Sequence, residues 1–241
     1  MDRAEGRRLD CREERPRGSP LDGLACAQAA RLQPSSATPF EQAPRFSGRA
    51  SRVQKKLELA VETLKKEHPC EEVESWCEDE ARFGLKPVLR RVWSPIGERP
   101  LAKVDARYEW LWLYAAVHPR TGRTFWLVLP RLDASCVQLF LDEFARTNAT
   151  EGKRIVLVWD GAPAHRATGL QVPERITLIS LPAYTPELNP GERVWPLVKE
   201  GVANQAHETL DELEQKVCSG CQKISAEEVS ALTNYHWWPK L

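Results

Sequence analysis

The sequence lacks the apolar runs that membrane and secreted proteins need. None approaches the ~18 consecutive apolar residues of a membrane-spanning helix, and the charged N-terminus has no apolar signal core. Seven cysteines, an odd number, do not indicate a disulfide framework. Neither a P-loop lysine motif nor a G-x-G-x-x-G motif occurs, so no nucleotide cofactor is implied. We therefore expect a soluble cytoplasmic protein without a membrane partner.

Net charge is also absent, because 34 Lys and Arg balance 34 Asp and Glu. Whole-chain electrostatics therefore argue neither for nor against a nucleic-acid partner. Residues 1–67 carry a mild excess, 14 Lys and Arg against 10 Asp and Glu, which would either contact phosphates or simply be solvated. Residues 1–52 show no sustained periodicity and predict a disordered or extended basic arm. Residues 53–241 are expected to form the folded domain.

A buried strand that ends in an acid is the most informative feature of the chain. Four apolar β-formers, Ile155–Val158, predict a strand buried on both faces, and Asp160 follows it. A carboxylate there is costly unless it is paired, hydrogen-bonded or bound to a metal, and α/β folds tend to place their sites at such strand ends. Ile176–Leu181 predicts the neighbouring strand. The helix predicted to start at Asn189 then brings a second acid, Glu192, towards the first.

Hydrophobic periodicity predicts the remaining elements. They are a helix over Val53–Glu67, a strand over Glu71–Glu80, a hairpin over Trp110–Val117 and Thr124–Leu129, a helix over Asp133–Asn148, and helices at about Thr209–Lys223 and Ala226–Thr233. This order suits an α/β, ribonuclease H-like fold, a mixed five-stranded sheet flanked by helices. The hairpin tryptophans Trp110, Trp112 and Trp126 are expected in the core rather than as a base-stacking platform.

Three acidic motifs carry a resemblance to a known family. Asp79 opens a D-E-x-x-F segment, residues 160–165 (DGAPAH) match D-x-A-x-x-H, and residues 186–195 (PELNPGERVW) match P-E-L-N-P-x-E-x-x-W. With these motifs in order, the chain from about Lys55 to its C-terminus resembles the DDE transposases, in the insertion-sequence branch of the Tc1/mariner group. The resemblance implies the same ribonuclease H-like fold.

The resemblance also implies that Asp79, Asp160 and Glu192 are the catalytic residues and metal ligands. Phosphodiester cleavage is eased by two divalent ions ~4 Å apart, and Mg²⁺ prefers hard oxygen ligands. By resemblance, Asp79 bridges two Mg²⁺ ions while Asp160 and Glu192 hold one each, and Mn²⁺ can substitute. Because strand side chains alternate, only one of Asp79 and Glu80 can face a shared site. The resemblance selects Asp79.

Two of these acids, Asp79 and Glu192, also allow a purely structural interpretation. The acidic run around Asp79 would also suit a solvated strand edge. Glu192 falls at the third helical position after the Asn189 cap, where it fits a capping box as well as a metal site. His165 either lies near the site, orienting a phosphate or a water, or is a satisfied loop histidine.

Basic residues and a cysteine pair leave further alternatives open. The basic residues Arg82, Lys86, Arg90 and Arg91 alternate with apolar and aromatic ones. This pattern suits a DNA backbone lying beside an acidic site, or an ordinary amphipathic strand pair. The pair Cys218 and Cys221 lacks the second pair that a structural zinc site usually needs, so we expect it to pack on a helix face.

We therefore predict a Mg²⁺-dependent transposase that nicks the ends of its element and joins them to target DNA. The alternatives are a nuclease of the same fold that only hydrolyses, and a truncated, inactive remnant that binds DNA or a protein partner. Family members usually carry a helix-turn-helix region before the catalytic domain, which we do not recognise in this sequence. A separate N-terminal DNA-binding chain and a homodimer are the further partners that this interpretation allows, and the nucleoid is the expected location.

Overall fold

The structure, a computed structural model, describes residues 44–97, 101 and 107–239. Most of the predicted N-terminal arm, residues 1–43, lies outside the described residues. Helix α2 (Pro44–Glu67) begins well before the predicted start at Val53, so the expected boundary between arm and domain falls inside a helix. The residues before Val53 lack a regular apolar repeat, and the hydrophobic pattern therefore could not mark this start.

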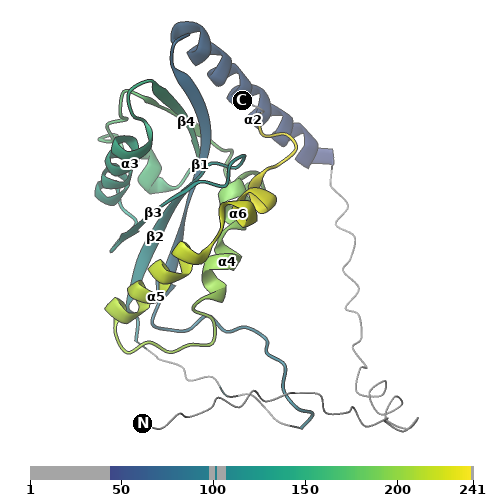
Figure 1. Ribbon diagram of the computed structural model, residues 1–241, viewed down its shortest axis with the longest axis vertical. Helices are drawn as coiled ribbons and strands as arrows, with labels where there is room; N and C mark the ends of the chain where they lie inside the picture. The colour runs from purple at the N-terminus through teal and green to yellow at the C-terminus, as the bar shows by residue number, and fades with distance from the viewer. Residues whose placement is uncertain (1–43, 98–100, 102–106, 240–241) are drawn as a thin grey trace, which may run out of the picture. The chain divides into compact units, whose positions relative to one another are not determined.

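Five strands form one mixed sheet in the order β3-β2-β1-β4-β5 (Figure 1). The strands are β1 (Glu72–Gly84), β2 (Trp110–Val117), β3 (Thr124–Leu129), β4 (Lys153–Trp159) and β5 (Ile176–Ser180). Strands β1, β2 and β3 pair antiparallel, whereas β4 pairs parallel to both β1 and β5. This is the ribonuclease H-like topology, and the predicted fold class is confirmed.

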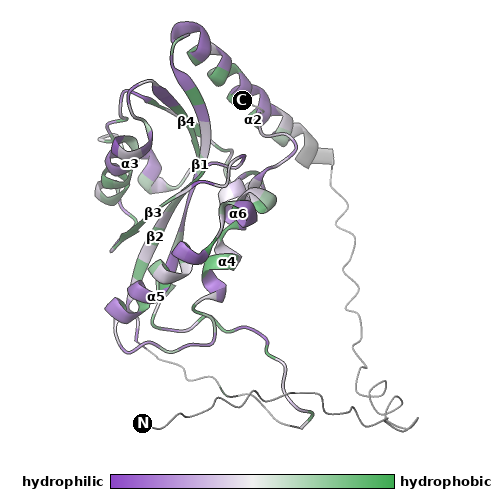
Figure 2. Ribbon diagram, in the orientation of Figure 1, coloured by the Kyte–Doolittle hydropathy of each residue, from purple (hydrophilic) through white to green (hydrophobic). Residues whose placement is uncertain are grey.

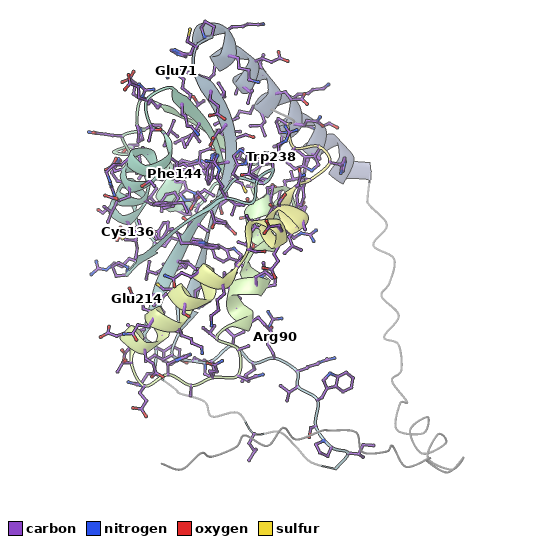
Figure 3. The ribbon with its side chains drawn as sticks, viewed as in Figure 1. Glu71, Arg90, Cys136, Phe144, Glu214 and Trp238 are labelled. Atoms are coloured by element: carbon purple, nitrogen blue, oxygen red, sulfur yellow. The ribbon has the colours of Figure 1, made fainter. Side chains whose placement is uncertain are left out.

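Helices cover both faces of the sheet (Figure 1). Helix α3 (Ala134–Asn148) covers one face, where Phe140 and Phe144 pack in a core with Trp76 of β1. The other face carries α2 and three C-terminal helices, α4 (Trp195–Glu200), α5 (Leu210–Lys223) and α6 (Ala226–Thr233). Figure 3 shows Phe144 on the α3 side and Trp238 on the α2 side. No helix in the described part of the chain is long and apolar enough to cross a membrane.

Side-chain caps and amphipathic faces explain where these helices begin. Asp133 caps α3 by accepting a hydrogen bond from the Cys136 backbone N–H at 2.9 Å. Ser225 and Glu228 form a capping box at the start of α6. Figure 2 shows hydrophilic and hydrophobic residues mixed along α2 and α5, as expected of helices with one buried face.

Cys221 is buried on α5 and Cys218 is half-buried, which fits the packing role.

Strand β1 is the central strand, and its two faces contact the two cores. Cys77 and Phe83 belong to the core beneath α2 and α5, and Trp76 to the core beneath α3. The strand continues to Gly84, past the predicted end at Glu80, because Ala81 and Phe83 remain buried. The hairpin tryptophans are less buried than predicted, since Trp110 is 40% exposed while Trp112 and Trp126 are partly buried.

Candidate metal and active site

Asp79 lies in the middle of the sheet, on the face of β1 that α4 covers. It is only 7% exposed, and the indole Nε1–H of Trp195 donates to its Oδ2 at 2.5 Å. A Cβ placed on Gly191 would lie 3.2 Å from the Asp79 Cβ, so the backbone at Gly191 packs tightly against this carboxylate side chain. The alternative that Asp79 belongs to a solvated strand edge is therefore wrong.

Asp160 is the first residue after β4, beside Asp79. Strands β1 and β4 pair in parallel with Cys77 opposite Val158, and the same register, continued by two residues, brings Asp160 next to Asp79. The Ala162 backbone N–H donates to Asp160 Oδ1 at 2.8 Å. Half of the Asp160 side chain remains exposed, so the carboxylate is available to a ligand.

Glu192 lies on a 3-10 turn, Pro190–Arg193, rather than on the α-helix that the sequence predicts. The α-helix, α4, begins only at Trp195. Asn189 caps the turn by accepting from the Gly191 N–H at 3.0 Å, and its amide donates to the Glu78 carbonyl at 2.8 Å. The Asn189 backbone N–H donates to the Pro186 carbonyl, so the capping-box alternative for Glu192 is wrong.

The three acids line a single cavity of about 550 Å³. Burial, and then the neighbouring charge of Glu192, raises the pKa of Asp79 well above its usual range. Burial also raises the pKa of Glu192, although Lys199 and a hydrogen bond with Asp79 act against the rise. Carboxylates in contact resist ionisation unless a cation joins them. Their hard oxygen atoms are the donors that Mg²⁺ prefers, so this set of residues fits a divalent ion.

His165 is buried behind Asp160 and does not face the cavity. Its side chain is 2% exposed, and both ring nitrogens have acid partners: Nδ1 lies 2.8 Å from Asp160 Oδ1 and Nε2 lies 2.8 Å from Glu80 Oε1. The ring also stacks on Trp159, with centroids 4.3 Å apart. Of the two alternatives for His165, this geometry fits the satisfied loop histidine, because both ring nitrogens already have acid partners.

Two glutamates of β1 near this histidine were missed in the sequence. Glu80 does face away from Asp79, as strand alternation requires, yet it is joined to Asp160 through His165. Glu78 is fully buried, and neither of its carboxylate oxygens has a hydrogen-bond partner. Charged residues are rarely fully buried unless they are paired. Glu78 and Glu80, at alternate positions of a strand predicted to be central, could therefore have indicated a functional or paired acid.

The predicted basic residues lie outside the acid cavity. The Arg82 guanidinium lies 5.2 Å from the centre of the Trp110 ring, and Arg82 and Lys86 line a separate cavity of about 430 Å³. Arg90 and Arg91 are exposed beyond β1, and Figure 3 shows Arg90 near the end of α4, far from Glu71. The arginine that does line the acid cavity is Arg166, which the sequence analysis did not single out.

Comparisons with known proteins find a family match and related folds. The family model described as DDE superfamily endonuclease matches residues 74–214, more than half of the chain. The uncharacterized protein y4pE/y4sA of Sinorhizobium fredii is 35% identical over 116 residues, which are 48% of this chain and 85% of that relative. The family match includes Asp79, Asp160 and Glu192.

Solved structures of the Mos1 transposase share the fold. A paired-end complex with the left transposon end matches with a TM-score of 0.54 and 16% identity, and a mariner paired-end complex with Mn matches with 0.56 and 15%. Each match covers 89% of this chain and 66% of the Mos1 chain. This chain therefore spans just under two thirds of the Mos1 transposase, and the likeness describes the fold.

Proposed function

This chain belongs to the DDE superfamily endonucleases, and on that premise we propose that it is a transposase that cuts the ends of a DNA element and joins them to target DNA. The observation that supports this most strongly is the cavity shared by Asp79, Asp160 and Glu192. Three carboxylates at one opening provide what metal-assisted phosphodiester chemistry requires of a protein, namely oxygen ligands in a fixed arrangement.

We propose Mg²⁺ as the metal, with Mn²⁺ as a substitute. Asp79, Asp160 and Glu192 would hold the ions, because all three line the same cavity. When bound, such ions activate an attacking oxygen and stabilise a departing one. The contribution of the chain is to fix the ligands: Trp195 holds Asp79 Oδ2, and Ala162 holds Asp160 Oδ1.

Two further residues at the cavity suit a DNA strand. Arg166 is exposed there and offers a guanidinium group to a phosphate. Tyr184 is 97% exposed and has a φ of 58°, a conformation uncommon for a non-glycine residue and often found at functional sites. An exposed aromatic ring beside a nuclease site is placed to stack on a base. The Arg82 and Lys86 cavity would contact DNA further along the duplex.

Recognition of the element's ends remains a prediction. The Mos1 structure in the comparison contains a left transposon end, and we propose the DNA ends of this chain's own element, and target DNA, as the corresponding partners. Sequence-specific binding would come from residues before α2 or from a separate N-terminal DNA-binding chain. A homodimer would hold two ends together.

The test uses labelled duplexes copied from the DNA that flanks the gene on each side, a supercoiled plasmid as target, and Mg²⁺. A transposase is expected to nick the duplexes and to join their 3′ ends to the plasmid. The control is Asp160→Asn, which keeps the shape of the side chain but removes its charge. Nicked ends without joined products would support the hydrolytic nuclease instead. Binding without cleavage by the unsubstituted protein would support the inactive remnant and overturn the proposal.

A further inference from the structure

Asp160 is held through one oxygen. Both His165 Nδ1 and the Ala162 backbone N–H lie 2.8 Å from its Oδ1, and neither uses Oδ2. The Asp160 side chain is nevertheless half exposed and lines the acid cavity. A half-exposed carboxylate would ordinarily rotate freely. Two donors on the same oxygen fix its orientation and leave Oδ2 for a ligand.

The histidine that provides one of these donors is itself held on three sides. Its Nε2 lies 2.8 Å from Glu80 Oε1, its ring stacks nearly parallel on Trp159 with an interplanar angle of 9°, and its Nδ1 lies 3.3 Å from the Asp160 carbonyl oxygen. Glu80 lies in turn on the central strand β1, where its backbone lies opposite Tyr114 of β2. The position of Asp160 is therefore tied to β1, the central strand of the sheet.

We propose that His165, backed by Glu80, is a positioning residue that orients Asp160 for a divalent ion at the acid cavity. We call Glu80, His165 and Asp160 the acid–histidine clamp. The proposal rests on the proposed function, because it concerns how one of the metal ligands is held. It assigns a role to two residues that lie outside the cavity itself. Partners of this kind typically contribute about 10- to 100-fold to metal affinity.

The charges around the ring are consistent with two donated protons. Although burial lowers the pKa of His165, its hydrogen bonds to Asp160 and Glu80 raise that pKa to about 11. Each ring nitrogen lies 2.8 Å from a carboxylate oxygen, and because an ionised carboxylate only accepts hydrogen bonds, both nitrogens act as donors. Glu78 is the more distant acid, since its Oε2 lies 3.8 Å from Nε2 whereas Glu80 Oε1 lies 2.8 Å from it.

Two substitutions of His165 separate positioning from packing. The amide nitrogen of asparagine is as many bonds from Cβ as Nδ1, and the amide nitrogen of glutamine is as many as Nε2. His165→Asn therefore keeps a donor for Asp160 and loses the one for Glu80, whereas His165→Gln does the reverse. If His165 only filled space, the effect of each substitution on metal affinity would follow the size of the new side chain and not the position of its donor nitrogen. His118→Gln is the matched control, because His118 is similarly buried at 7% but hydrogen-bonds Thr121 instead.

The measurement is the Mn²⁺ affinity of each purified full-length variant, by isothermal titration calorimetry and by the paramagnetic resonance signal of free Mn²⁺. We expect His165→Gln to weaken Mn²⁺ binding by about 10- to 100-fold, His165→Asn to weaken it several-fold less, and His118→Gln to leave it unchanged. Thermal unfolding verifies that each variant folds. Should His165→Gln not fold, Glu80→Gln, which keeps an acceptor oxygen but loses its charge, is expected to weaken Mn²⁺ binding.

The outcomes distinguish this inference from the proposed function. If Asp160→Asn leaves Mn²⁺ affinity unchanged, the proposed function fails. If Asp160→Asn weakens binding but His165→Gln does not, only the clamp fails. Glu78, Glu80 and His165 also offer ligand atoms within 4.8 Å of one another. An ion that survives Asp160→Asn but is lost in Glu78→Gln would lie there and overturn the clamp, since Nε2 cannot donate to Glu80 while it binds a metal.

Discussion

Two of the buried acids of strand β1, Glu74 and Asp79, lie in opposite electrostatic surroundings. Glu74, near its start, is 5% exposed and contacts two cations, Arg123 at 2.6 Å and Lys153 at 3.0 Å. Asp79, five residues further along, is 7% exposed and meets Glu192 and other acids instead. Although burial opposes it, hydrogen bonds from Arg123, Trp76 and Lys153 lower the pKa of Glu74 to about 2. Burial and the charge of Glu192 raise the pKa of Asp79.

The difference separates an acid that stabilises the fold from one that serves a site. A buried carboxylate with cations and hydrogen bonds has its charge compensated within the protein. A buried carboxylate among other acids has no such compensation, and a domain would be more stable without it. The uncompensated arrangement at Asp79 therefore requires another explanation, which a bound divalent ion provides.

Removing the charge of a proposed metal ligand is expected to have the largest effect. Asp160→Asn should lower the rate of Mg²⁺-dependent DNA cleavage by at least about 10³-fold, because the charge that holds an ion is lost. Gel assays of nicked duplex measure this rate, and Glu74→Gln, on the same sheet but outside the cavity, is the control. Cleavage that persists in Asp160→Asn would remove this residue from the catalytic set.

Removing the compensated acid is expected to lower stability instead. Glu74→Gln leaves Arg123 and Lys153 without their buried partner. The pKa of Glu74 is lowered from 4.5 to about 2, which, discounted for screening at the 44% exposed Arg123 side chain, corresponds to about 2 kcal/mol of unfolding free energy at neutral pH. Because the folded-state pKa is lowered, this contribution is present above pH 4.5 and is lost as the pH falls towards 2. Urea unfolding should therefore show that the difference in unfolding free energy between the unsubstituted protein and Glu74→Gln is, at pH 3, about half or less of its value at pH 7. A gap that does not change with pH would contradict this account.

The smallest expected effect is a gain in stability, not a loss. In the presence of EDTA, Asp79→Asn should raise the unfolding free energy by about 1 kcal/mol at neutral pH, since it removes one of the mutually repelling charges. The asparagine oxygen can still accept from Trp195. The raised pKa of Asp79 means that its ionisation destabilises the fold increasingly as the pH rises. Thermal unfolding with EDTA measures the change, and a loss of stability in Asp79→Asn would show that the acids do not repel one another.

Local patterns predicted most of the fold. The strands Trp110–Val117 and Thr124–Leu129 have the predicted bounds, because apolar runs separated by a Pro-Arg-Thr-Gly turn determine them. Helix α6 was also predicted with its observed bounds, and Ser225 caps it. Strand β1 was predicted too short, since the exposed Arg82 hides a strand that tertiary burial extends to Gly84.

The site was predictable only where a motif marks it. Asp79, Asp160 and Glu192 could be named from their motifs, and the structure brings them to one cavity. The role of Glu80 could not be predicted, because it depends on His165, which lies 85 positions away and meets it only in the folded domain. Residue types alone do not reveal which buried acids form hydrogen bonds and which, like Glu78, form none.

The most direct test is anomalous diffraction from crystals of the protein grown with Mn²⁺. We expect Mn²⁺ peaks within coordination distance of the carboxylate oxygens of Asp79, Asp160 and Glu192, with the Asp79 carboxylate contacting two ions. Crystals with a bound ion elsewhere and none at these three acids would contradict the claim that they form the metal site.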